Sequence, residues 1–300
     1  MLEDFTIKNF RGIKELTLPS LKRVNLLVGK NGVGKTSVLE AVDLWAQGGS
    51  PKAINGIFAQ RQEPTKADLL FFDSIKALSV GPTDSPVRVT PAVRRGLEAV
   101  DVDGTLKFLD AVDVSGRPAA APKAQVFWIP SIGLDGKAVS EAWIAHLIDG
   151  IDRDTTHALS LLIPDVDKTM LAGQVPYVEF KDGLRAPLKR LGDGAMRIFG
   201  MALGVASAKG GILLIDEIEN GIHYSAQVEV WKFLIAAADK LNVQVFATTH
   251  SRDTVNALAG ASHEDDHIVY RLERYKGELQ AVAFEAVHLD TVAEYEVEIR

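Results

Sequence analysis

A glycine-rich octapeptide, Gly29-Lys30-Asn31-Gly32-Val33-Gly34-Lys35-Thr36, constrains the fold of this chain more than any other segment. It has the pattern G-x-x-x-x-G-K-[ST] and follows the apolar run VNLLVG, which is typical of a strand buried on both faces. From Thr36 to Ala46, apolar side chains recur at helical spacing. Strand, glycine-rich loop and helix in this order predict a phosphate-binding loop at a helix N-terminus. A chance match is the alternative, and the flanking strand and helix disfavour it.

The loop predicts a site for a nucleoside triphosphate with Mg²⁺. The Lys35 ammonium would act as a catalytic cation on the β- and γ-phosphates, and the Thr36 hydroxyl would ligate Mg²⁺. No N-K-x-D guanine-reading element occurs near an expected strand end, which favours ATP over GTP. We expect the nucleotide to contact the loop and the start of its helix through Asn31, Gly32, Val33, Gly34, Lys35, Thr36 and Ser37.

Two later apolar strands end in residues that suit phosphate hydrolysis. Ile212–Ile215 is followed by Asp216 and Glu217, and Val245–Ser251 contains His250. We expect Asp216 to hold Mg²⁺ through its water shell, and Glu217 to orient and deprotonate the attacking water. His250 would donate a hydrogen bond to the γ-phosphate or hold the water. Taken singly, each is explained as well by a turn or a structural histidine, but next to the loop they favour a hydrolytic site.

A fourth motif, Leu191-Gly192-Asp193-Gly194-Ala195-Met196-Arg197, directly precedes an expected helix. Gly192 or Asp193 would be the N-cap residue, and a glycine-rich helix start can bind an anion. The plainer interpretation is a capped helix after a hairpin. By itself the motif does not decide between the two.

The rest of the chain predicts an α/β fold with a mixed central sheet flanked by helices. Residues 3–9 and 13–18 alternate as antiparallel strands do, and 48–183 is less regular. We expect one domain over residues 1–300 with 48–183 inserted as a lid or helical region. The remaining expected elements are strands at 124–130, 211–215 and 243–248, helices within 140–163 and at 194–207 and 224–241, hairpins turning at 181–183 and 275–277, and a short acidic helix at the end of the chain.

Composition excludes several classes of protein. The absence of cysteine excludes disulfides, Cys-ligated zinc and thiol catalysis. No apolar run reaches the roughly 20 residues of a membrane span, and the acidic start lacks the features of a signal peptide, so we expect a cytoplasmic protein without a membrane partner. The net charge of -7 argues against a dedicated nucleic-acid binder. The basic residues Arg94, Arg95, Lys181, Arg185, Lys189 and Arg190 are interpreted as solvated loop and strand-edge residues.

The order of these motifs resembles the ABC-type ATPase head, in the branch that includes RecF-like, SMC-like and OLD-like proteins. Asn9–Gly12 looks like the "NFRG" element of that branch, Asp216–His223 like its "DEIENGLH" segment, and Thr248–Ser251 like its "TTHS" switch. The likeness is greatest to small bacterial "AAA family ATPases" of the OLD-like group. It covers residues 1–47 and 184–300 well and the segment between them loosely.

The resemblance implies a P-loop NTPase fold of the ABC-ATPase type and a homodimer in which two heads sandwich two ATP molecules. Gly192, Asp193 and Gly194 would then contact the γ-phosphate bound by the partner, and Arg11 would lie near the phosphates. The family's serine is replaced by Gly192, so main-chain N–H groups such as that of Gly194 must make the contact. His223 stands where many members have Asp.

Two positions implied by the resemblance are left open. The glutamine of the Q-loop cannot be placed, and Gln125 and Ser131 flank the strand where it belongs. A structural hydrogen bond and a catalytic one are equally compatible with His223.

Three functions follow from the resemblance. The first is a regulatory ATPase whose dimerisation cycle controls a separate effector, such as a nuclease or toxin, in DNA repair or anti-phage defence. The second is a nucleotide-gated clamp on DNA or RNA with weak ATPase activity. A transporter subunit is the third, and the soluble-branch motifs disfavour it. Residues 48–183 cannot hold a long coiled coil, and too few residues follow 290 for the TOPRIM nuclease of full-length OLD proteins.

Overall fold

The central sheet contains six strands in the order β15-β14-β3-β13-β12-β8. The computed structural model describes residues 1–73, 76–94, 97–109, 121–261 and 266–285. Neighbours from β14 to β8 pair in parallel, and β15 joins as an antiparallel strand, which confirms the predicted mixed sheet. The strands are β3 (Val24–Val28), β8 (Val126–Ile129), β12 (Ile212–Ile215), β13 (Gln244–Thr249), β14 (His267–Tyr275) and β15 (Glu278–Glu285).

A second, antiparallel sheet has the order β2-β1-β4-β5-β6-β7. The two N-terminal strands were predicted, whereas the other four come from the segment 48–183. That segment also supplies β8, the edge strand of the central sheet, so it contributes to both sheets. The strands are β1 (Phe5–Phe10), β2 (Ile13–Leu18), β4 (Leu78–Gly81), β5 (Val87–Arg94), β6 (Leu97–Val102) and β7 (Thr105–Phe108).

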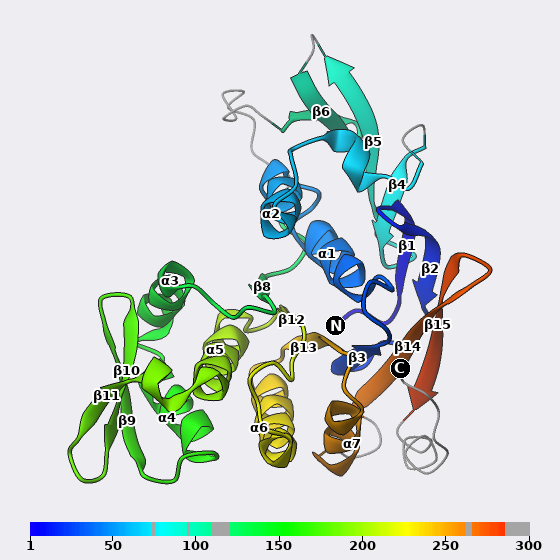
Figure 1. The fold of residues 1–300 in the computed structure, drawn as a ribbon. Coiled ribbons are helices and arrows are strands. Elements are labelled where there is room, and N and C mark those ends of the chain that lie inside the picture. Colours follow the sequence, from blue (N-terminus) through cyan, green and yellow to red (C-terminus); the bar gives the residue numbers. More distant parts are fainter. Residues whose placement is uncertain (74–75, 95–96, 110–120, 262–265, 286–300) are drawn as a thin grey trace.

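The second half of the segment 48–183, together with the residues up to 191, forms a small lobe at one side of the molecule (Figure 1). Its three-stranded sheet has the order β11-β10-β9. The predicted hairpin is confirmed, because β10 and β11 pair antiparallel with Glu179 opposite Arg185. The elements of this lobe are α3 (Gly136–His146), α4 (Ile151–Ser160), β9 (Val166–Ala172), β10 (Val175–Phe180), β11 (Arg185–Pro187) and the 3-10 turn η2 (Leu188–Leu191).

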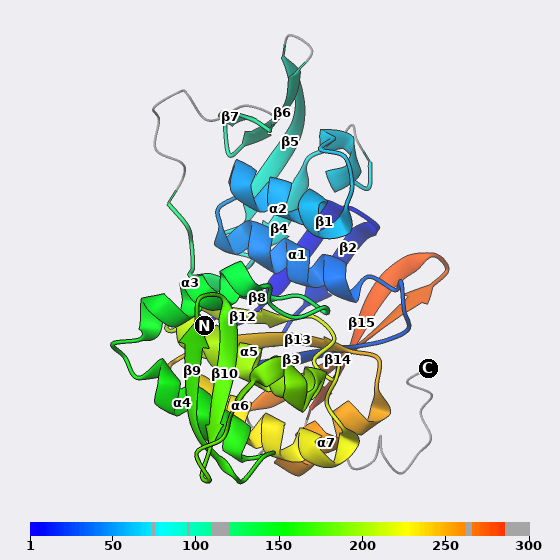
Figure 2. The same cartoon turned by 60° about the vertical axis from the view of Figure 1, so that its left-hand side comes forward.

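Helices cover both faces of the central sheet (Figure 2). Because successive strand residues point to opposite faces, Leu27 packs with α1, α2 and the antiparallel sheet, whereas Leu26 and Val28 pack with α3 to α7. The pattern did not predict α7. The remaining helical elements are α1 (Lys35–Ala46), α2 (Pro51–Arg61), η1 (Ala67–Leu70), α5 (Asp193–Ser207), η3 (Tyr224–Ala226), α6 (Gln227–Lys240) and α7 (Arg252–Ala261).

Two sequence predictions fall outside what the structure describes, namely the basic side chains of Arg94 and Arg95 and the acidic helix at the end of the chain. Among the residues that the structure does describe, no helix has both the length and the apolar character needed to cross a membrane.

Candidate active site

The phosphate-binding loop joins β3 to α1 at the carboxyl end of the sheet. Gly29 adopts a positive φ of 155°, and a Cβ there would lie 2.6 Å from the Leu272 carbonyl oxygen, so only glycine fits without a shift of the backbone. The buried Lys35 ammonium donates to the carbonyls of Gly29 (2.6 Å) and Lys30 (3.1 Å). Burial lowers the pKa of Lys35, and the three carboxylates that follow β12 act in the opposite direction. The loop therefore holds a cation in place before any nucleotide arrives.

Asp216 stands opposite Thr36 at the end of β12. The Thr36 hydroxyl lies 3.3 and 3.2 Å from the two carboxylate oxygens of Asp216, and the Thr248 hydroxyl donates to Asp216 Oδ1 at 2.6 Å. Burial raises the pKa of the Asp216 carboxyl, against the two threonine hydrogen bonds. A buried carboxylate and a hydroxyl within hydrogen-bond distance form the hard oxygen donor set that suits Mg²⁺ beside a phosphate. The residues present thus fit the predicted ion.

Glu217 is fixed by its main chain as well as by its side chain. It has a left-handed φ of 49°, and its N–H donates to the Thr248 hydroxyl at 2.8 Å. The amide of Asn220 donates to Glu217 Oε2 at 2.8 Å and to the Ser131 carbonyl at 3.2 Å. One carboxylate oxygen is thus held, and the side chain is one-third exposed, as a general base for water requires.

Arg197 braces this turn from α5. Its guanidinium donates to the carbonyls of Pro130 (2.5 Å), Asp216 (2.5 Å) and Glu217 (3.0 Å). Burial lowers the pKa of Arg197 to about 10, so the side chain is a cation at neutral pH. The motif Leu191–Arg197 was singled out for its glycines, and the role of its arginine was missed. The available signal was the one basic residue of a helix whose following residues are nearly all apolar.

His250 lies beside Glu217 at the end of β13. Its Nδ1 is 3.1 Å from Glu219 Oε1 and 4.0 Å from Glu217 Oε1, and its main-chain N–H donates to Glu219 at 3.0 Å. Glu219 therefore orients the imidazole. Since the pattern flagged Asp216 and Glu217 and passed over Glu219, this carboxylate is a second residue that the sequence analysis missed.

The glycine-rich start of α5 is built differently. Gly192 is the N-cap residue with a φ of 97°, it makes no side-chain cap, and both it and Asp193 are exposed. A Cβ on Gly194 would lie 2.5 Å from the carbonyl oxygen of Gly221, so the helix start packs directly against the loop that follows Glu217. A contact of these three residues with nucleotide stays a prediction.

The positions left open by the sequence have clear local partners. His223 Nδ1 is within 2.8 Å of the Ser225 hydroxyl, and the His223 side chain caps η3. Gln125 donates to the Ser207 carbonyl at the amino end of β8, away from the phosphate loop. Of the two Q-loop candidates, it is Ser131 that adjoins Glu217, through Asn220.

Arg11 lines a cavity of about 390 Å³ together with Gly32, Gly34 and Ser37 of the phosphate loop region. Its guanidinium is paired with the fully buried Glu40 (3.3 Å) and with a second carboxylate. The predicted position near the phosphates is compatible with this place, and a contact with nucleotide stays a prediction.

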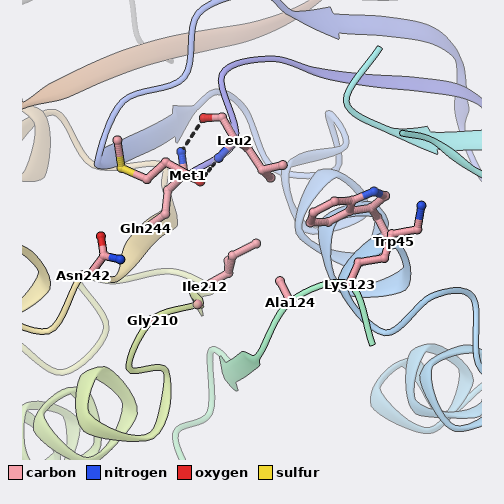
Figure 3. Close-up of a pocket in the computed structure, with 10 residues that line it drawn as sticks. Met1, Leu2, Trp45, Lys123, Ala124, Gly210, Ile212, Asn242 and Gln244 are labelled. Atoms are coloured by element: carbon pink, nitrogen blue, oxygen red, sulfur yellow. Dashed lines mark hydrogen bonds between the residues drawn. The ribbon is translucent and has the colours of Figure 1, made fainter. Parts of the chain in front are cut away.

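A separate hollow of about 240 Å³ opens at the amino ends of β12 and β13 (Figure 3). Gln244 exchanges two hydrogen bonds with the main chain of Leu2 there, at 2.8 and 2.9 Å, while Trp45 and Lys123 face it from the side of α1. These contacts tie the start of the chain to the sheet. The hollow lies at the opposite end of the strands from the phosphate loop and is not part of the candidate active site.

Comparisons by sequence link the chain to known proteins. The sequence pattern of the family described as "AAA ATPase domain" matches residues 1–78 and 145–255. An uncharacterized protein of Methanocaldococcus jannaschii is 51% identical over 45 residues, which are 15% of this chain and 20% of that protein. The DNA replication and repair protein RecF of Pseudoalteromonas translucida is 41% identical over 64 residues, 21% of this chain and 18% of its own length. The matches thus span about a fifth of each relative.

Solved structures with a similar fold are heads of SMC proteins. An SMC head bound to the C-winged helix domain of ScpA has a TM-score of 0.60 at 15% identity, covering 95% of this chain and 97% of that one. The SMC head domain from Thermotoga maritima has a TM-score of 0.52 at 14% identity, covering 95% and 99%. At these identities the comparison establishes the fold, which agrees with the predicted P-loop fold of the RecF/SMC-like branch.

Proposed function

This chain belongs to the AAA ATPase domain family, and from that premise we propose that it is the ATP-hydrolysing head of a regulatory device. Two copies would enclose ATP with Mg²⁺, and the cycle of closure and reopening would control a partner effector. The observation that carries the proposal is the cluster of Lys35, Thr36, Asp216, Glu217 and His250, which three separate segments bring to one end of the central sheet. We propose that the protein acts in the cytoplasm, in DNA repair or anti-phage defence. Its head would be of the OLD-like type.

The chain's own residues account for the steps of hydrolysis. Lys35 would leave its loop carbonyls for the β- and γ-phosphates, and the loop's N–H groups would hold the phosphate chain. Mg²⁺, when bound through Thr36 and Asp216, would neutralise charge on the phosphates. Glu217, held at one oxygen by Asn220, would take the proton of the attacking water at the other oxygen. His250, oriented by Glu219, would contact the γ-phosphate.

Dimerisation is supported by the start of α5. Gly192 and Asp193 are exposed at a helix N-terminus, which favours an anion. The atoms nearest to Gly194 belong to the loop after Glu217, so a phosphate bound by a second copy would press on that loop. A second copy completes the site in this proposal, and a protein effector is the object of control.

The hydrolytic part of the proposal is tested by turnover of ATP with Mg²⁺. Lys35→Ala should abolish ATP binding, whereas Glu217→Gln should bind ATP and lose turnover by about 100- to 10,000-fold. Glu229→Gln is the matched control, since Glu229 pairs with Lys232 on the surface of α6. Normal turnover in Glu217→Gln would show that the base is another group.

A clamp on DNA or RNA is the second candidate, favoured by Lys189 and Arg190, which are exposed in the turn before α5. Arg185 is paired with Glu179, and Lys181 with the Pro164 carbonyl, so these two are less available. Binding of duplex DNA that weakens steeply with salt and stimulates turnover would support the clamp.

A further inference from the structure

The cavity beside the phosphate loop contains more positive charge than the loop itself explains. Its walls include Arg11, Arg61 and Arg274, next to Gly32, Gly34 and Ser37. The Thr36 hydroxyl instead lies against Asp216, one of the carboxylates that mark the γ-phosphate end, and the same carboxylates act on the charge of Lys35. Since the N–H groups of such a loop cradle the α- and β-phosphates, the cavity lies at the α-phosphate and nucleoside end.

Two of the three guanidinium groups are already occupied. Arg11 is 7% exposed, with Nε on Glu40, Nη2 on Glu63 at 2.6 Å and Nη1 on the Leu69 carbonyl at 3.3 Å. Arg274 donates to the carbonyls of Gly12 and Gly277, both at 3.0 Å. Each of the two therefore ties one chain segment to another.

Arg61, from the C-terminal end of α2, is differently placed. Its Nε and Nη2 bind the two oxygens of Glu40 at 2.5 and 3.1 Å, and Nη2 also lies 3.2 Å from the Ser37 hydroxyl. The side chain is 33% exposed, and its Nη1 has no partner among the residues that the structure describes. The fully buried Glu40 fixes the guanidinium plane, so little conformational entropy remains to be lost when an anion binds.

On the basis of the nucleotide site proposed above, we propose that Arg61 binds the α-phosphate of the nucleotide. Nη1 would donate to a non-bridging α-oxygen, and Nη2 would turn from the Ser37 hydroxyl to the same phosphate. Arg11, the arginine that the family resemblance favours, instead holds Glu40 from the other side and serves as a positioning residue for Arg61. Because the α-phosphate is common to ATP and ADP, Arg61 binds both to the same extent.

The test compares wild type with Arg61→Lys, which keeps a positive charge on Glu40 and loses the fork geometry. Since a hydrogen bond to a charged group contributes about 1.5–3 kcal/mol, the Kd for ATP and the Kd for ADP should both rise about 10- to 100-fold, by the same factor. The preference of wild type between the two diastereomers of ATP that carry sulfur at the α-phosphate should be lost. Arg185→Lys, on β11 and paired with Glu179, is the control and should bind as wild type does.

Each outcome has one meaning. Unchanged Kd values and an unchanged diastereomer preference in a folded Arg61→Lys would overturn the assignment of Arg61. A loss for ATP alone would also overturn it, because that result places the guanidinium at the γ-phosphate. Failure of wild type to bind either nucleotide would refute the proposed function instead. Thermal unfolding of each variant shows whether it is folded, and Arg61→Gln serves as a second variant with the same expected pattern.

Discussion

The phosphate-loop half of the site and the start of α5 differ in how they are built. At the first, the chemistry lies in side chains that contacts within the chain already hold: Lys35 on loop carbonyls, Asp216 between two threonines, Glu217 on Asn220. At the second, Gly192 and Gly194 offer main-chain groups, and no side chain caps the helix. The first half is organised by one copy of the chain. The second half presents main-chain groups at the surface, as expected for a surface that acts on a nucleotide bound by another copy.

Arg197 joins α5 to the turn at Asp216 and Glu217, so its replacement should have the largest effect of the three variants compared. Arg197→Met removes three hydrogen bonds, two of them to the carbonyls of Asp216 and Glu217. Misplacement of a base by about 1 Å can cost about 100-fold, so kcat should fall by that order while KM changes little. Steady-state kinetics measures both. A fall in affinity with unchanged kcat would show that Arg197 supports nucleotide binding instead.

Gly194→Ala should have a smaller effect, which starts in the second half and reaches the first through the loop after Glu217. The new Cβ would lie 2.5 Å from the Gly221 carbonyl and must displace the loop that holds Asn220. We expect turnover to fall about tenfold, within the usual range of coupling between sites, with ATP affinity unchanged. Gly200→Ala in the same helix is the control, because its Cβ meets nothing closer than Leu134 at 3.7 Å. Equal turnover in Gly194→Ala and Gly200→Ala would show that the two halves are not coupled through this contact.

The smallest expected effect is a pH-dependent change in thermal stability, and it arises in the phosphate-loop half. Asp216 has a pKa raised by burial above its ordinary value of 3.8, so between these two values the folded state binds more protons than the unfolded state and loses stability as pH rises. Without Mg²⁺, Asp216→Asn should therefore raise Tm by about 2–4 °C near pH 8, as expected for about 1 kcal/mol, and by less near pH 4. Calorimetry at both pH values measures this. A gain that is larger near pH 4 than near pH 8 would contradict the assigned cause.

Much of the first half was predictable from the sequence, and the contacts between elements were not. The Gly29–Thr36 loop and the carboxylates after Ile215 are local patterns at strand ends, where parallel strands bring them to one edge. Asn220, Glu219 and Arg197 act through contacts that depend on how helix and strand ends pack. Of the four strands that residues 48–183 add to the antiparallel sheet, β4 pairs with β1 and the other three follow it, and no local period reveals this long-range pairing.

The same limit explains why the roles of Arg11 and Arg61, beside the phosphate loop, could not be predicted from the sequence. Arg11 belongs to a recognisable motif, and sequence alone favours it as a phosphate contact. Only the structure shows that Glu40, Glu63 and the Leu69 carbonyl occupy its guanidinium. It also shows that Nη1 of Arg61, a residue in no motif, has no partner within the described part of the chain.

The central claim is that a second copy completes the site, and the oligomeric state of Glu217→Gln tests it most directly. This variant keeps the phosphate loop and should hold ATP without consuming it. Light scattering with Mg²⁺ should give one copy without nucleotide and two copies with ATP, and Gly194→Ala in the same background should shift this equilibrium toward one copy. A Glu217→Gln protein that binds ATP and remains a single copy at high concentration would contradict the account.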